Sequence, residues 1–155
     1  MPRFSTFVVL LSLLVLAGCN RVEPQAKPTL SATFTTGWLD LEKDGTSEWR
    51  WSEPTASIAL TNDAAQAETV VVEFDVLSIS ARSLQMTLGN KSLPTLALPL
   101  NEWVHQKISV ELSAGISPLT FTTTEAGATV AGDTRSLYFC VRNFAVAPPE
   151  PAVAP

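Results

Sequence analysis

Two tryptophans and an arginine form the most distinctive chemical pattern in the sequence. Trp49 and Trp51 are two positions apart, so in a β-strand their indoles share one face, and Arg50 lies between them. Sugar rings stack their apolar faces on aromatic rings while nearby polar groups bond their hydroxyls. With the preceding Trp38, the pattern predicts a ligand site at Trp38, Trp49, Arg50 and Trp51. The alternative is that the indoles pack in a core, because they are large apolar groups that bury well.

A run of acidic residues precedes the second and third of these tryptophans. Asp40, Glu42 and Asp44 occupy alternate positions before Gly45, and oxygen ligands of this kind suit Ca²⁺. An EF-hand loop is excluded, because Trp51 stands at the twelfth position, where a bidentate Glu is required. We therefore expect an acidic loop in water here, with no metal and no cofactor; a bound Ca²⁺ is the alternative.

Catalytic patterns are scarce in this chain. His105 is its one imidazole, on the polar side of an alternating segment with Lys107 and Glu111. The sequence contains no G-x-S-x-G elbow, no H-E-x-x-H motif and no phosphate-binding glycine loop. A pair of carboxylates that are distant in sequence, as in glycosidases, stays open. We expect a protein that is not an enzyme.

The composition excludes further classes of protein. The 155 residues suit one domain, and 10 Lys+Arg against 15 Asp+Glu give a net charge of −5. This acidic balance argues against nucleic-acid binding, because no basic surplus is available to neutralise phosphates. With 46% apolar and 16% charged residues, wholesale disorder is not expected.

The N-terminus reads as a targeting segment. Arg3 is followed by an apolar stretch over residues 4–16, too short to span a hydrocarbon layer of about 30 Å as a helix. We therefore assign residues 1–18 to a signal peptide. An uncleaved anchor is the alternative.

The end of this segment, Leu16-Ala17-Gly18-Cys19, resembles the lipobox of bacterial lipoproteins. The resemblance implies cleavage before Cys19 and acylation of its thiol and new amino group, which anchors the protein to a membrane. Asn20 follows, rather than the Asp that retains enteric lipoproteins at the inner membrane. We expect a cell-envelope lipoprotein, on the outer membrane and facing the periplasm. An ordinary signal peptide with an incidental Cys is the alternative.

Proline-rich segments flank the remainder of the chain. Residues 19–33 are expected to form the lipidated Cys and a tether, residues 34–146 a domain, and residues 147–155 a proline-rich disordered tail. With Cys19 lipidated, Cys140 has no partner for an intramolecular disulfide. We expect an inert, semi-buried thiol there; a reactive or dimer-forming thiol is the alternative.

Apolar and polar residues alternate through residues 34–146, as in half-buried β-strands. The residues predicted to face inward are Val70, Val72, Phe74 and Val76, then Leu84, Met86 and Leu88, then Ile108, Val110 and Leu112. Helical periodicity is nearly absent. The fold predicted is all-β, an antiparallel β-sandwich. A jelly roll is favoured over an immunoglobulin topology, because the Cys…Trp…Cys spacing is missing, and a closed barrel stays open.

The order of several short motifs resembles the galactose-binding-like jelly-roll modules of bacterial cell-envelope and polysaccharide-related proteins. The motifs are Gly37-Trp38, Trp49-Arg50-Trp51-Ser52, Leu88-Gly89-Asn90 and the closing segment from Arg135 to Phe144. Some members of that family bind carbohydrates, and others only mediate contacts with proteins. The resemblance therefore implies a binding module.

Two hypotheses follow. In the first, the chain is a lipid-anchored, non-catalytic envelope module that contacts a glycan or envelope polysaccharide. In the second, it is a structural lipoprotein that docks a protein partner through a sheet face or edge. Exposure of Trp49 and Trp51 in an open groove favours the first, and burial of both inside the sandwich favours the second.

Overall fold

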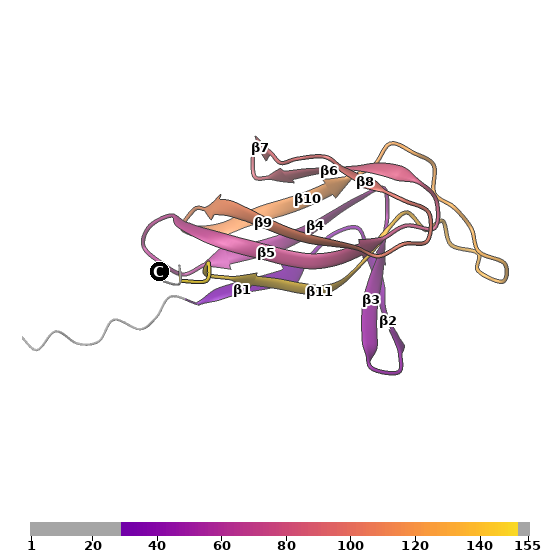
Figure 1. Cartoon of the computed structure of the whole chain (residues 1–155), viewed down its shortest axis with the longest axis horizontal. Coiled ribbons are helices and arrows are strands. Elements are labelled where there is room, and N and C mark those ends of the chain that lie inside the picture. The colour runs from indigo at the N-terminus through magenta and orange to yellow at the C-terminus, as the bar shows by residue number, and fades with distance from the viewer. Residues whose placement is uncertain (1–28, 152–155) are drawn as a thin grey trace, which may run out of the picture.

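Alternating side chains bring two apolar sheet faces together in residues 29–151, the part of the chain that the computed structural model describes (Figure 1). One sheet contains β1 (Leu30–Phe34), β4 (Thr55–Asn62), β10 (Gly115–Thr122), β6 (Arg82–Leu88) and β7 (Lys91–Ser92) in that order, with β8 (Leu96–Leu98) also paired to β6. The other contains β2 (Trp38–Asp44), β3 (Ser47–Ser52), β11 (Cys140–Ala147), β5 (Glu68–Leu77) and β9 (Val104–Leu112). All strand pairs within these sheets are antiparallel, so the predicted β-sandwich is confirmed.

The core consists of the residues that the alternation placed inward. On β5, Val70, Val72, Phe74 and Val76 are fully buried, and β9 and β11 pair with this strand on its two sides. Phe74 packs against Phe121 of β10 in the facing sheet, with ring centroids 5.6 Å apart. Burial of these side chains against the facing sheet supplies the main favourable term in folding.

Two segments that were expected to lie outside regular structure are strands. Leu30, Ala32 and Phe34 alternate inward on β1, which pairs with β4 along its whole length. The sandwich thus begins at Leu30, inside the segment predicted to be a tether. The acidic residues 40–44 belong to β2, which pairs with β3 in a hairpin. Their alternation was that of a strand and not of a loop.

The β2–β3 hairpin diverges from the rest of its sheet. β3 and β11 are in register at two positions, Trp51 opposite Cys140 and Arg50 opposite Val141. Beyond them the register of β11 with β5 shifts between Arg142 and Ala145, as at a β-bulge, and Asn143 has a φ of 53°. The free part of the hairpin therefore projects away from the sandwich (Figure 1).

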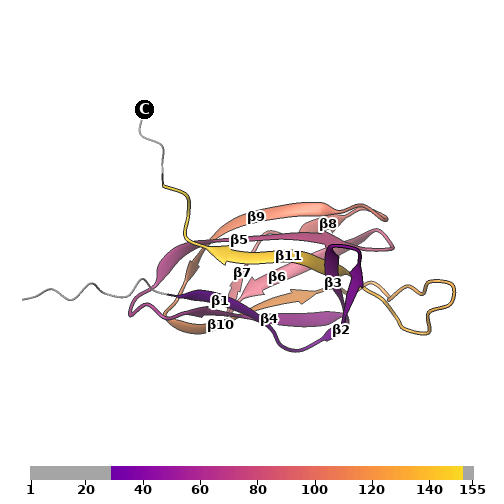
Figure 2. The same ribbon diagram turned by 90° about the horizontal axis from the view of Figure 1, so that it is seen from below.

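The ends of the described chain lie far from this hairpin. Figures 1 and 2 both place the start of β1 and the end of β11 at one end of the sandwich. The hairpin and the loop of residues 123–139 lie at the other end. No helix in residues 29–151 is long and apolar enough to cross a bilayer. The signal peptide and the lipid site at Cys19 lie outside the described residues.

Candidate functional site

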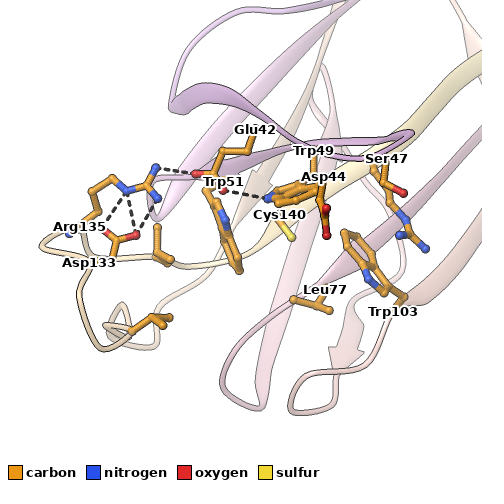
Figure 3. A pocket seen from close by; sticks show the side chains of 13 residues that line it. Glu42, Asp44, Ser47, Trp49, Trp51, Leu77, Trp103, Asp133, Arg135 and Cys140 are labelled. Atoms are coloured by element: carbon orange, nitrogen blue, oxygen red, sulfur yellow. Dashed lines mark hydrogen bonds and ion pairs between the residues drawn. The ribbon is translucent and has the colours of Figure 1, made fainter.

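A groove of about 490 Å³ lies on the outer face of the β2-β3-β11-β5-β9 sheet (Figure 3). The β2–β3 hairpin forms one wall, and the loop between β10 and β11 closes one end. The lining residues are Glu42, Asp44, Ser47, Trp49, Trp51, Leu77, Trp103, Val130, Asp133, Arg135, Leu137, Cys140 and Arg142. The groove thus combines three indoles with three carboxylates and two guanidinium groups.

The indoles of Trp49 and Trp51 both face this groove. They share one face of β3, as their spacing predicted, and this face is the outer one. Trp51 is 8% exposed and packs on Leu137 and Cys140 at the floor, while Trp49 is half-buried in the wall. The rings are therefore outside the core between the sheets and in contact with an open groove.

A chain of polar contacts fixes the Trp49 ring. Its Nε1 donates to Glu42 Oε2 at 3.2 Å, and Glu42 Oε1 accepts from Arg135 Nη1 at 2.7 Å (Figure 3). Arg135 also donates to both carboxylate oxygens of Asp133. These hydrogen bonds from Arg135 lower the pKa of Asp133 to about 2. The ion pair of Arg135 with Glu42 therefore joins the loop to the hairpin across one end of the groove.

The other end of the groove contains a second arginine. Arg142 stacks on Trp103, with the guanidinium carbon 3.9 Å from the ring centroid, and its Nε donates to Asp75 Oδ2 at 3.2 Å. Asp75 also accepts from Asn143 at 2.7 Å and lies 2.9 Å from His105 Nδ1. Burial would raise the pKa of Asp75, but these three hydrogen bonds outweigh it and lower the pKa. The Arg142 cation is thereby held over the face of an indole.

The loop that closes the groove is anchored at its base. Arg82 donates through Nε to Ser78 Oγ at 2.7 Å, and its guanidinium lies 5.7 Å from the ring centroid of Tyr138. Glu125 accepts hydrogen bonds from the Thr123 hydroxyl and the Ser83 backbone N–H, which lower its pKa to about 2. Backbone hydrogen bonds between Ala128 and Leu137 close the loop on itself. These contacts hold the loop in place, although no strand of β1 to β11 runs through it.

Two of the four predicted ligand residues lie elsewhere. Trp38 packs between the sheets against Phe34, Phe121 and Phe139, and its Nε1 donates to the Ser57 carbonyl at 2.8 Å. Arg50 lies on the opposite face of β3 from the groove, where its Nη1 donates to the Leu39 carbonyl at 3.1 Å. It lines a separate hollow of about 390 Å³. The four residues therefore do not form one surface.

Sequence reasoning missed Trp103, Arg135 and Arg142 as groove residues. Trp103 immediately precedes β9, beside the turn at Asn101-Glu102, a position typical of an anchor at the start of a strand. Arg135 stands between Thr134 and Ser136, and Arg142 between Val141 and Asn143, a local pattern that suggested no ligand. Their approach to the hairpin depends on pairing between segments that are distant in sequence.

No catalytic constellation accompanies the groove in the described residues. His105 contacts Asp75 and lies 3.4 Å from Glu73 Oε1, so carboxylates flank both ring nitrogens. In residues 29–151, no cluster of His, Cys, Asp and Glu has the geometry of a metal site. Cys140 is 1% exposed, and burial raises the pKa of its thiol to about 12. It is therefore protonated and a poor nucleophile at neutral pH.

Comparisons by sequence identify no relative: no family model and no curated protein matches the chain. Comparisons by structure do find similar folds. A family 35 carbohydrate binding module from an environmental isolate matches with a TM-score of 0.53 and 18% identity, over 82% of this chain and 99% of that one. A family 35 module from Clostridium thermocellum gives 0.49 and 13%, over 80% and 100%. The first likeness shows that the chain shares the β-sandwich fold of a carbohydrate-binding module.

Proposed function

We propose that this protein is a non-catalytic carbohydrate-binding module of the cell envelope. The observation that carries the proposal is the lining of the groove by three indoles, those of Trp49, Trp51 and Trp103, with charged groups between and beside them. Apolar rings accept the C–H faces of a sugar, and carboxylates and guanidinium groups bond its hydroxyls. The fold shared with a carbohydrate-binding module supports the same function.

The groove suits a sugar better than a purely apolar ligand. Glu42 and Asp133 are paired with Arg135, and Arg142 is paired with Asp75, so these polar groups have fixed directions. Arg142 keeps two terminal nitrogens for which the described residues provide no acceptor. Preorganised donors and acceptors reduce the ordering cost of binding a hydroxyl-rich ligand.

The lipid anchor belongs to the same proposal. Cleavage before Cys19 and acylation of this residue would attach the module to a membrane through its N-terminal side, and the order Cys19-Asn20 favours the outer membrane, facing the periplasm. The β2–β3 hairpin and the 123–139 loop, which line the groove, lie at the end of the sandwich away from the start of β1 (Figure 2). An anchor on the N-terminal side would therefore leave the groove accessible. Cys19→Ala should release the protein from the membrane fraction or block its maturation. Unaltered fractionation would refute lipidation.

Binding is tested with a panel of xylan, galactomannan, β-1,3-glucan, polygalacturonate and the polysaccharide of lipopolysaccharide. We expect at least one to shift the tryptophan fluorescence in a saturable way. Trp49→Ala and Trp103→Ala should each weaken binding about tenfold or more, because each removes a stacking surface. Ile116→Ala is the control, since Ile116 is 73% exposed on β10 of the other sheet.

Two outcomes would contradict the proposal. One is that the protein binds no polysaccharide of the panel although its cooperative unfolding shows that it is folded. The other is glycan binding that Trp49→Ala and Trp103→Ala leave unchanged. If an envelope protein were instead captured by the wild type and lost in the same two variants, the groove would be a protein-docking surface.

A further inference from the structure

The strand β9 forms one edge of its sheet. It pairs with β5 over nine consecutive positions without a register shift, and within residues 29–151 no strand pairs with its other side. Figure 2 shows β9 along the upper margin of the sandwich. The edge of a sheet presents main-chain N–H and C=O groups that a further strand can bond. The free side of β9 is therefore a surface on which another strand can pair.

The other edge strands of the sandwich are shorter or less regular. β1 has five residues, and β7 and β8 have two and three. β2 belongs to the projecting hairpin, and its register with β3 shifts between Trp38 and Leu41. β9 also leaves apolar surface uncovered, because Val104 and Ile108 pack on the core but are only half-buried. Among the strands of the described chain, β9 thus offers the longest regular edge and a partly exposed apolar strip beside it.

The outer face of β9 carries charges of both signs. Lys107, Ser109 and Glu111 are all exposed on this face. Lys107 lies opposite Glu73 of β5, with its Nζ 3.7 Å from a carboxylate oxygen. Glu111 lies opposite Thr69, which is uncharged. The strand therefore has a carboxylate for which its neighbour β5 supplies no cation.

We propose that two copies of this chain pair through β9, antiparallel and about a two-fold axis at Ser109. This inference goes beyond the proposed function and does not depend on it. In this register Lys107 of each copy lies opposite Glu111 of the other, so the symmetry forms two pairs of opposite charge. On the inner face Ile108 of each copy lies opposite Val110 of the other, which covers the half-buried edge.

The charges of β9 select this register among those that keep outer side chains opposite outer ones. An axis at Lys107 would place two lysines opposite each other, and an axis at Glu111 would place two glutamates opposite each other. Like charges directly opposite on neighbouring strands are destabilising. An axis at Ile108 would place His105, and not Lys107, opposite Glu111. The axis at Ser109 is the register that matches lysine with glutamate.

The pairing has a consequence for the groove. Strands that pair edge to edge continue one sheet, so the outer faces of the two copies lie on the same side. The groove lies on this outer face, and the two grooves of a dimer therefore face in the same direction. The association itself should be weak and dependent on concentration, because one added pair of strands buries less surface than a standard protein interface.

Cross-linking at the axis tests the pairing and its register. Residues directly opposite on antiparallel strands have Cα atoms about 4.5–5.5 Å apart, which a disulfide can bridge. Mild oxidation of full-length Ser109→Cys should therefore give a covalent dimer on a non-reducing gel. Ser31→Cys is the control, because Ser31 is exposed on the edge strand β1 of the other sheet. It should form no more dimer than the wild type, and equal yields at the two positions, or none at Ser109, would overturn the proposal.

A charge exchange tests the partners of the ion pairs. Lys107→Glu and Glu111→Lys should each weaken self-association about tenfold or more, because each places like charges opposite. The double variant Lys107→Glu/Glu111→Lys should restore it. The contact of Lys107 with Glu73 is lost in the double variant too, so only pairing between copies accounts for the recovery.

Sedimentation velocity of the full-length chain over a range of concentrations measures the effect. Thermal unfolding of each variant confirms that the fold is kept. A wild type that stays monomeric at every concentration would overturn the proposal, and so would a double variant that associates as poorly as the single ones.

Discussion

The guanidinium of Arg142 lies over the indole of Trp103, 3.9 Å from its centroid. These residues come from β11 and from the segment before β9, two strands that are separated by β5 in the sheet. The contact therefore spans β5, where Asp75 accepts from Arg142. One face of the Trp103 ring is thus covered by a cation within the groove.

Arg142→Ala should destabilise the fold by about 1–3 kcal/mol, because it removes a charge-assisted hydrogen bond and a cation–π contact. Urea unfolding measures the loss. Lys107→Ala is the control, since Lys107 is more than half exposed and lies 3.7 Å from Glu73, and it should change stability by less than about 0.5 kcal/mol. Equal losses in the two variants would show that the stacked arginine has no special role.

Gly37→Ala should be severely destabilising, by about 3 kcal/mol or more. Gly37 has a φ of +73°, and a Cβ on it would lie 2.0 Å from the Thr55 carbonyl oxygen, which is backbone and cannot move aside. Gly45→Ala is the matched control, because Gly45 also has a positive φ but nothing within 4 Å of an added Cβ. It should cost only about 1 kcal/mol, from backbone strain. Thermal unfolding of the two variants checks the difference.

The hydrogen bonds to Asp75 predict a loss of stability in acid. Because the folded-state pKa of Asp75 is lowered, its carboxylate stabilises the fold at pH values above the ordinary value of 3.8. This contribution disappears as the pH falls from that value through the lowered folded-state pKa. Asp75→Asn should therefore reduce stability at pH 6 but approach the wild type as the pH falls below the lowered folded-state pKa of Asp75. Urea unfolding across this range tests the prediction, and a constant difference between the two proteins would contradict it.

Cys140 should resist alkylation in the folded protein. Its thiol is buried and its pKa is raised to about 12, so little thiolate exists at pH 8. Iodoacetamide should modify Cys140 only after denaturation, which peptide mass spectrometry can locate. Modification at equal rates with and without denaturant would show that the floor of the groove opens readily.

The fold was predictable because its pattern is local. Phe74 and Leu84 each alternate with polar neighbours, and period-two alternation fixes which side chains enter the core before any partner strand is known. The β2 strand was missed because Asp40, Glu42 and Asp44 suggest water and a loop. Their alternation with Leu39 and Leu41 was the signal that could have identified the strand.

The site was only partly predictable, because it depends on strand order. The shared face of Trp49 and Trp51 follows from their spacing, but spacing does not tell which face of β3 meets the other sheet. Arg50, between them, necessarily points to the opposite face. The chain between β1 and β2 turns at Gly37, which lies directly against β4. This position brings the Trp38 indole beside β4 and into the core. Arg135 reaches Glu42 across 93 positions of sequence, a contact that no local pattern encodes.

The start of β1 and the end of β11 lie opposite the β2–β3 hairpin that lines the groove, and this placement has a practical consequence. An affinity handle, a fluorophore or a fused enzyme joined before β1 or after β11 would emerge from the far pole of the sandwich (Figure 1). Immobilisation on a sensor chip through a tag at either of these two positions would thus orient the groove toward the flowing solution.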